Sequence, residues 1–197
     1  GYLDRKQQNA LQRAIEKELQ VAQSRYKVRQ LTRARDAALV LFLLNTGLRL
    51  NEALDLRETD VQFSERKALV LVRQGKGSKQ RTVPLNPAAR KALEDWLRIR
   101  PEGGQGYVWV AVESRSSSHL SARSVQRSFQ RIGKAAGIER LTPHACRHTF
   151  AKNLVNSGVG LEKVASLLGH SNLNTTRLYT TPSEHDLEVA VLGLNGG

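Results

Sequence analysis

Residues 68–85, ALVLVRQGKGSKQRTVPL, carry the pattern of a β-hairpin. An apolar, β-branched run leads into the turn sequence QGKGSK, and a second extended segment follows and ends at Pro84. A further short strand is expected at 107–112, YVWVAV. The other periodic segments have the apolar spacing of helices. The sequence therefore predicts an α+β fold that is mainly α-helical and contains a small antiparallel β-sheet.

Helices are expected where apolar residues recur at helical spacing and end signals flank them. In residues 3–30, which are strongly polar, Leu11, Ile15 and Leu19 form one narrow apolar stripe. Gly169 has the conformational freedom to close a helix with a left-handed residue. The expected helices cover residues 3–30, 34–44, 87–99, 122–136 and 161–168, with a short further helix that begins near Arg49 and another that begins at Pro143.

The length of the chain sets its domain organisation. With 197 residues, of which 40% are hydrophobic, the chain can bury one ample core. We therefore expect a single domain over residues 1–197, with a polar helical or linker region at 1–30 and a C-terminal tail at 180–197.

The charge of the chain favours a polyanion as partner, and nucleic acid is the first candidate. There are 31 Lys and Arg residues against 18 Asp and Glu residues, a formal net charge of +13. A membrane surface is the alternative, but no long basic amphipathic helix with aromatic anchors is evident, and the longest apolar run, residues 37–44, is too short to span a bilayer. Cys146, the single cysteine, cannot form an internal disulfide, and residues 1–30 do not resemble a signal peptide. We expect a cytoplasmic protein without a membrane partner.

The segment TPHACRHTF, residues 142–150, allows more than one chemistry. Thr142 can cap a helix, and the proline after it suits the first helical position. His144 and His148 would then lie one turn apart, a workable spacing for zinc. A third ligand is missing, since Cys146 points away from that face and no other Cys/His pair has ligand spacing. We therefore predict no metal.

Anion binding is the second possibility for this segment. His144 and Arg147, at positions i and i+3, share a helical face, and both can donate hydrogen bonds to an oxyanion. The alternative is that the histidines are ordinary core or surface side chains and that the arginine is one cation among many. Cys146 is expected to pack inward.

The expected helix at 122–136 has a basic face. A solvated surface is the more common role of such a face, but here the charges share one sign and have no evident partners, which favours contact with a phosphate backbone. The residues of this face are Arg123, Arg127, Arg131 and Lys134.

Five motifs occur in the order and spacing of the tyrosine recombinase family. They are TGLRLNE (46–52), GKGSKQRTVPL (75–85), TPHACRHTFA (142–151), LLGH (167–170) and RLYT (177–180). The sequence resembles the catalytic domain of a phage integrase or Xer-type enzyme from about residue 30 to residue 185. The resemblance implies a site-specific recombinase that integrates, excises or resolves DNA by cutting and rejoining strands through a covalent 3′-phosphotyrosyl intermediate.

The resemblance also implies roles for two arginines and the tyrosine. Arg49 and Arg147 would bind the scissile phosphate, because two guanidinium forks match its oxygens and neutralise the charge of the transition state. Tyr179 would attack the phosphorus. The phosphotyrosyl bond would conserve the energy of the broken phosphodiester, so no cofactor is implied. Each residue also has an ordinary structural role open to it: Arg49 could simply pair with Glu52, and Tyr179 could be a half-buried aromatic residue.

The remaining implied roles concern proton transfer and DNA contact. Lys76 would be the general acid for the departing 5′ oxygen, with Lys79 as the rival; either could instead be a solvated turn residue. His144 would assist deprotonation of the tyrosine or orient the phosphate, and His170 would donate a second hydrogen bond to the phosphate. His148 is then structural. The expected DNA-binding residues are Lys79, Arg81, Arg123, Arg127 and Arg131.

The implied partner is a double-stranded DNA recombination site, on which a homo-oligomer, a tetramer on two sites, would assemble. A complete family member usually carries an N-terminal helical domain that clamps the DNA, and we expect it to be absent because little sequence precedes residue 30. The tail at 186–197 is expected either to dock on a neighbouring protomer or to pack within its own chain. The rival functions are an inactive DNA-binding protein of the same fold and a metal-dependent phosphodiesterase. The complete set of motif residues argues against the first, and the lack of an Asp/Glu cluster argues against the second.

Overall fold

The computed structural model describes residues 1–21, 27–73, 80–102, 105–112, 119–170 and 176. The chain divides into two compact units, Gly1–Phe150 and Ala151–Gly197, which are described separately. The elements in chain order are α1 (Arg5–Val21), α2 (Lys27–Thr46), α3 (Leu50–Leu54), the 3₁₀ turn η1 (Glu58–Asp60), β1 (Val61–Phe63), β2 (Ala68–Val72), β3 (Arg81–Pro84), α4 (Pro87–Ile99), α5 (Ala122–Ala136), α6 (Pro143–Asn156) and α7 (Leu161–Leu168).

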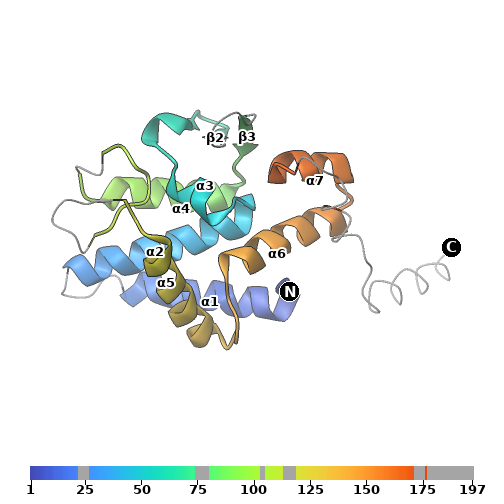
Figure 1. The fold of residues 1–197 in the computed structure, drawn as a ribbon. Helices are drawn as coiled ribbons and strands as arrows, with labels where there is room; N and C mark the ends of the chain where they lie inside the picture. The colour runs from blue at the N-terminus through green and yellow to red at the C-terminus, as the bar shows by residue number, and fades with distance from the viewer. Residues whose placement is uncertain (22–26, 74–79, 103–104, 113–118, 171–175, 177–197) are drawn as a thin grey trace. The chain divides into compact units, whose positions relative to one another are not determined.

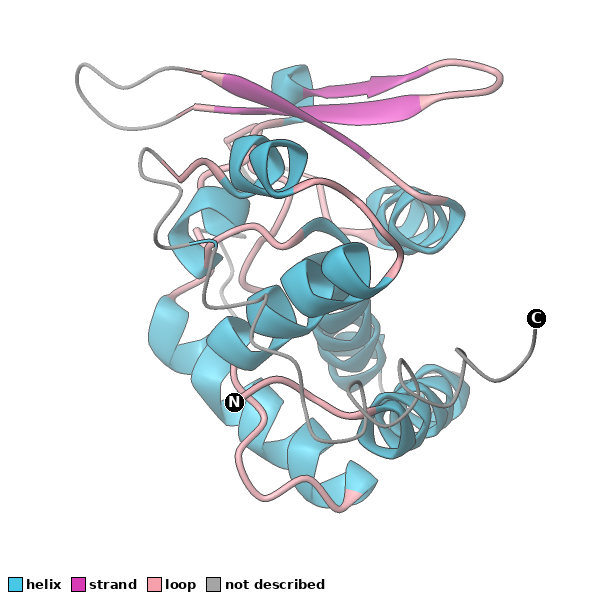
Figure 2. Cartoon of the chain, turned by 90° about the vertical axis from the view of Figure 1, so that its right-hand side faces the viewer, coloured by secondary structure: helices cyan, strands magenta, loops and turns pink. Residues whose placement is uncertain are grey.

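The sheet is antiparallel with the strand order β1-β2-β3 (Figure 2). Val70 of β2 pairs with Val61 on one side and with Val83 on the other, and both Val70 and Val83 are buried. The predicted hairpin is confirmed in its two strands, and its tip at 74–79 lies outside the described residues.

The prediction of a strand at 107–112 is wrong. Tyr107 and Val110 form only isolated bridges, with Arg57 and His119. Val108, Trp109 and Val110 are all fully buried, so this segment does not alternate between a core face and a solvent face. It crosses the core as an irregular apolar segment.

The expected helices at 3–30 and 34–44 have the wrong boundaries, because α1 ends at Val21 and α2 runs from Lys27 to Thr46. Leu11 and Ile15 are fully buried, but Leu19 is 40% exposed. A spacing of four residues drifts around a helix with 3.6 residues per turn, so Leu19 lies about 80° away from Leu11. Glu18, which is buried, takes the inward position instead.

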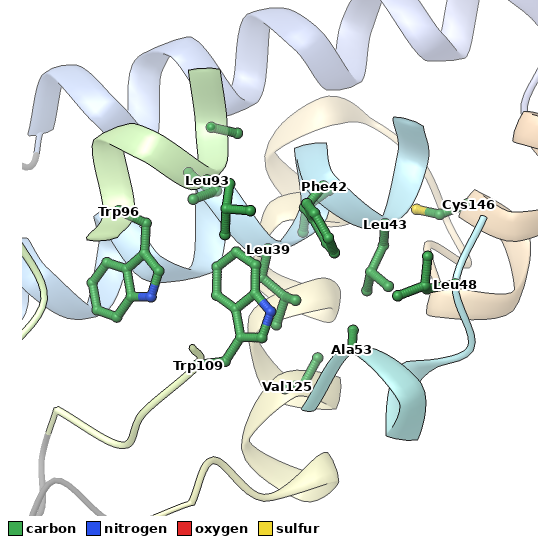
Figure 3. Close-up of a cluster of buried hydrophobic side chains, with 14 of the residues drawn as sticks. Leu39, Phe42, Leu43, Leu48, Ala53, Leu93, Trp96, Trp109, Val125 and Cys146 are labelled. Atoms are coloured by element: carbon green, nitrogen blue, oxygen red, sulfur yellow. The ribbon is translucent and has the colours of Figure 1, made fainter. Parts of the chain in front are cut away.

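The core of residues 1–150 surrounds α2, which packs against α1, α4 and α5 (Figure 1). At its centre, Phe42 of α2 contacts Trp109, and Trp109 stacks on Trp96 of α4 with ring centroids 6.3 Å apart and planes 6° from parallel (Figure 3). Trp96 donates its Nε1–H to the carbonyl oxygen of Val108 at 2.8 Å. None of the described helices combines the length and apolar character needed to cross a bilayer.

Candidate functional site

Arg147 links the start of α6 to the loop between α2 and α3. Thr142 caps α6, as the sequence predicts, because its Oγ1 accepts a hydrogen bond from the backbone N–H of Ala145 at 3.0 Å. Arg147 is 5% exposed, and its Nη1 donates to the carbonyl oxygen of Gly47 at 2.7 Å. Gly47 follows α2 with a left-handed φ of 63° and precedes Arg49 by two residues. The two motifs that contain the predicted phosphate-binding arginines therefore meet.

The carboxylate of Glu52 in α3 binds two arginines. Arg49 donates its backbone N–H to Oε2 at 2.8 Å and its Nη1 to Oε1 at 2.9 Å. Arg81 of β3 donates Nη1 and Nη2 to the same oxygens at 2.9 and 2.8 Å. The side chains of Glu52 and Arg81 are each 10% exposed, whereas that of Arg49 is 47% exposed. Arg49 thus presents a guanidinium that is fixed by the protein and accessible to an anion from solvent.

These arginines also control the protonation of Glu52. Burial acts to raise the pKa of its carboxyl, but the hydrogen bonds and charge of Arg81 and the hydrogen bonds of Arg49 outweigh burial and lower the pKa from its ordinary value. Glu52 is therefore an anion at neutral pH.

His144 and His148 lie one turn apart at the start of α6, with ring centroids 4.1 Å apart. His144 is exposed and can donate a hydrogen bond to an anion, whereas His148 is half-buried. Burial, followed by the charges of His144, the Gly1 amino group and Arg147, lowers the pKa of His148. Within the described part of the chain, no three Cys, His, Asp or Glu side chains gather as metal ligands would.

Cys146 is fully buried among the core residues, as Figure 3 shows, and the prediction that it faces inward is confirmed. Burial raises the pKa of its thiol to about 12. Its role is packing, because the thiolate that reacts with electrophiles is scarce at neutral pH.

His170 belongs to the unit that begins at Ala151. The helix α7 ends at Gly169 with a left-handed φ of 68°, as the sequence predicts, and His170 donates its backbone N–H to the carbonyl oxygen of Ala165 at 3.0 Å. Its Nδ1 lies 3.0 Å from Oγ1 of Thr176, which is fully buried. This contact fixes the orientation of the imidazole.

Three predicted site residues lie outside the described residues. They are Lys76 and Lys79, which belong to the tip of the hairpin, and Tyr179. Their proposed roles stay predictions.

The predicted basic face of α5 is divided in the structure. Arg123 and Arg127 are exposed, and the described residues provide no ion pair for either. Arg131 instead binds Glu18 of α1 and, at 2.8 Å, Asp36 of α2. The prediction that the whole face is unpaired is therefore wrong at Arg131, because two buried carboxylates take up its charge.

A cavity of ≈ 1150 Å³ lies between α2 and α5. Asp36 contributes the acidic group of its lining, and hydroxyl groups come from Thr32, Ser124 and Ser128. Five arginines also line it: Arg33, Arg35 and Arg131 form ion pairs with Glu18 or Asp36, whereas Arg29 and Arg127 are exposed. The surface beside Arg127 is thus concave and basic, which suits a polyanion.

The sequence pattern of the phage integrase family matches residues 2–185. The chain belongs to the phage integrase family. The tyrosine recombinase XerA of Thermococcus kodakarensis is 38% identical over 159 residues, which are 81% of this chain and 55% of the relative. This chain spans about half the length of the curated relatives it matches.

Solved structures of the same family agree in fold. The crystal structure of XerA recombinase has a TM-score of 0.79 at 28% identity and covers 100% of this chain and 66% of that chain. XerH site-specific recombinase, in a post-cleavage complex with a palindromic difH substrate, has a TM-score of 0.78 at 28% identity and covers 96% of this chain and 52% of that chain. The predicted α+β recombinase fold and the predicted family are confirmed.

Two side chains that shape the candidate site were not predicted from the sequence. Glu52 was considered only as a partner that would make Arg49 structural, but it holds Arg49 and Arg81 together. Thr176 was not considered at all, although it contacts His170. The threonine stands six residues after the histidine, and no pattern in the sequence singles it out.

Proposed function

We propose that this chain is the catalytic part of a site-specific DNA recombinase that cuts and rejoins strands through a 3′-phosphotyrosyl intermediate. The observation that carries the proposal is the hydrogen bond from Arg147 to Gly47, because it brings the two arginine motifs to one place. Arg49 stands there with an exposed guanidinium that Glu52 orients. A fixed positive group on an accessible surface stabilises a phosphoryl transition state without reorganisation.

In the proposed reaction, the phenolic oxygen of Tyr179 forms a bond to the scissile phosphorus as the bond to the 5′ oxygen breaks. His144 assists removal of the phenolic proton, and Lys76, or its rival Lys79, gives a proton to the departing 5′ oxygen. His170 donates a hydrogen bond to the phosphate. One phosphoester replaces another, so rejoining is the reverse reaction and consumes no ATP.

We propose that duplex DNA lies along the exposed part of α5. Arg123 and Arg127 support this placement, since both are exposed and the basic cavity adjoins Arg127. The formal net charge of +13 would strengthen binding at low salt. XerH, a relative in fold and sequence, was crystallised with its difH substrate.

We further propose that the complete protein assembles as a tetramer on two DNA sites, with the segment 186–197 as the candidate contact between protomers. Such an enzyme would work on nucleoid DNA in the cytoplasm. The alternative is an inactive DNA-binding protein of the same fold, but it would have no use for the complete set of motif residues from Arg49 to Tyr179.

The test uses a nicked duplex that bears a candidate recombination site, or a pool of sequences, incubated with the protein in EDTA. Wild type should form a covalent adduct visible on a denaturing gel, and Tyr179→Phe should form none. Tyr107→Phe is the matched control and should retain the adduct, because Tyr107 packs its ring against Arg57 and this contact survives in phenylalanine. Binding without any adduct in the wild type would favour the inactive DNA-binding protein.

A further inference from the structure

Arg81 stands at the base of the hairpin. It pairs across the sheet with Val72, and this is the pair of β2 and β3 nearest to the hairpin tip. Its side chain is 10% exposed, and both of its terminal nitrogens donate to Glu52 at 2.9 and 2.8 Å. A guanidinium so covered has little surface left for a DNA phosphate. Its geometry is that of a structural partner to a carboxylate.

The carboxylate that Arg81 binds also holds Arg49. Each oxygen of Glu52 accepts one hydrogen bond from Arg49 and one from Arg81. Four donors therefore fix both the position and the rotation of the carboxylate. Without Arg81, two of these hydrogen bonds are lost, and Glu52 can turn together with the Arg49 side chain that it orients.

Charge gives Arg81 a second effect on Arg49. Glu52 and Arg49 alone form a neutral pair, in which the carboxylate competes with any phosphate for the guanidinium. Arg81 adds a positive charge to this pair and engages the carboxylate on its other side. The group of three then keeps a net positive charge, which leaves Arg49 able to bind an anion.

We propose that Arg81 is a positioning residue that acts through Glu52 to hold the guanidinium of Arg49 in place and to tie it to the base of the β2–β3 hairpin. The inference rests on the proposed function, which gives Arg49 its role at the scissile phosphate. It differs from the sequence prediction that Arg81 contacts DNA directly.

Arg81→Ala tests the proposal, and Arg73→Ala is its matched control. Arg73 follows the last residue of β2 at the same hairpin base and forms an ion pair with Asp60 at 2.6 Å. Its side chain is more exposed than that of Arg81, and its loss removes the same charge and one ion pair without touching Glu52. The two readouts are the affinity for a nicked DNA duplex and the single-turnover rate of adduct formation at saturating DNA. Circular dichroism checks that each variant is folded.

Arg81→Ala should lower the adduct rate by roughly 100-fold, because misplacing a phosphate ligand by about 1 Å has effects of that order. The DNA dissociation constant should change less than about threefold, as expected when only transition-state contacts are lost. Arg73→Ala should leave both values within about threefold of wild type. Arg81→Lys should restore part of the rate, because an ammonium keeps the charge but cannot bind both oxygens as a fork. Weaker DNA binding with an unchanged rate at saturation would make Arg81 a DNA contact and overturn the proposal.

A second readout does not depend on activity. The NMR signal of the Arg49 Nε–H should shift in Arg81→Ala and stay in place in Arg73→Ala. If the wild type forms no adduct, the proposed function fails, and this signal alone decides the positioning role. A shift confined to Arg81→Ala would support it, and an unchanged signal would overturn it.

Discussion

The thiol of Cys146 lies in the core of residues 1–150 with no exposed surface. Burial raises its pKa from 9.0 to about 12, so the native thiol is protonated at pH 8. We expect iodoacetamide to leave the native protein unmodified at that pH and to label it fully in guanidinium, as mass spectrometry would show. The unfolded thiol ionises more readily, so the free energy of unfolding should also fall as the pH rises above 9.0. Equal labelling rates for the native and unfolded protein would contradict this.

Single residues were predictable from sequence when their partners are local. The Thr142 cap, the left-handed Gly169 and the inward position of Cys146 each follow from neighbours within one or two helical turns. The partners of Arg81 and Arg131 were not predictable, because Glu52 is 29 residues from Arg81 and Asp36 is 95 residues from Arg131. Such pairs depend on the packing of elements that the sequence order does not reveal.

At the scale of elements, Gly133 marks a close contact of α5. A Cβ atom at this position would lie 2.8 Å from Cβ of Leu141 and 3.1 Å from the carbonyl oxygen of Ile138. Gly133→Ala should therefore lower the free energy of unfolding by about 1–3 kcal/mol through overpacking, even though alanine favours a helix by about 1 kcal/mol. Ala135→Gly, at an exposed position of the same helix, measures the helix propensity alone. Urea unfolding compares the two, and a stabilised Gly133→Ala would refute the close contact.

The bounds of a helix were predictable where the sequence carries capping residues at its ends. The expected bounds 87–99 and 122–136 are those of α4 and α5, since Asn86 and Ser121 accept the capping hydrogen bonds and Gly137 closes α5 with a left-handed φ. Residues 3–46 contain no glycine or proline, so nothing in the sequence marks where α1 ends and α2 begins. The apolar run at 107–112 could not be separated from a strand by composition alone.

For the molecule as a whole, a buried ionic network joins α1, α2 and α5. Asp36 is 3% exposed and accepts hydrogen bonds from Arg35, Arg131 and Ser128. Asp36→Asn should lower the free energy of unfolding by about 3–5 kcal/mol, because it takes from the buried guanidinium of Arg35 the charge of the carboxylate with which it pairs. The matched control is Asp95→Asn in α4.

Asp95 is 44% exposed and pairs with Lys91 and Arg98 at the surface. Its replacement should cost less than about 1 kcal/mol. Urea unfolding followed by circular dichroism measures both variants. Similar costs for the two would show that the network around Asp36 is not effectively buried in solution.

At the scale of the whole molecule, properties that depend on residue types were again predictable, and properties that depend on the packing of elements were not. Five ordered motifs were enough to predict the family, because such motifs depend on residue types. The division of the basic face of α5 was not predictable, because it depends on Glu18 and Asp36 reaching Arg131 from other helices.

The stack of Trp96 on Trp109 gives the protein an optical reporter of its own. These are the chain's two tryptophans, and both lie in the core of residues 1–150. Trp109 is fully buried, and its Nε1 has no hydrogen-bond partner among the described residues, a setting in which indole emission shifts to the blue. Fluorescence excited at the indole band will therefore report the loss of this core and will not detect unfolding confined to residues 151–197.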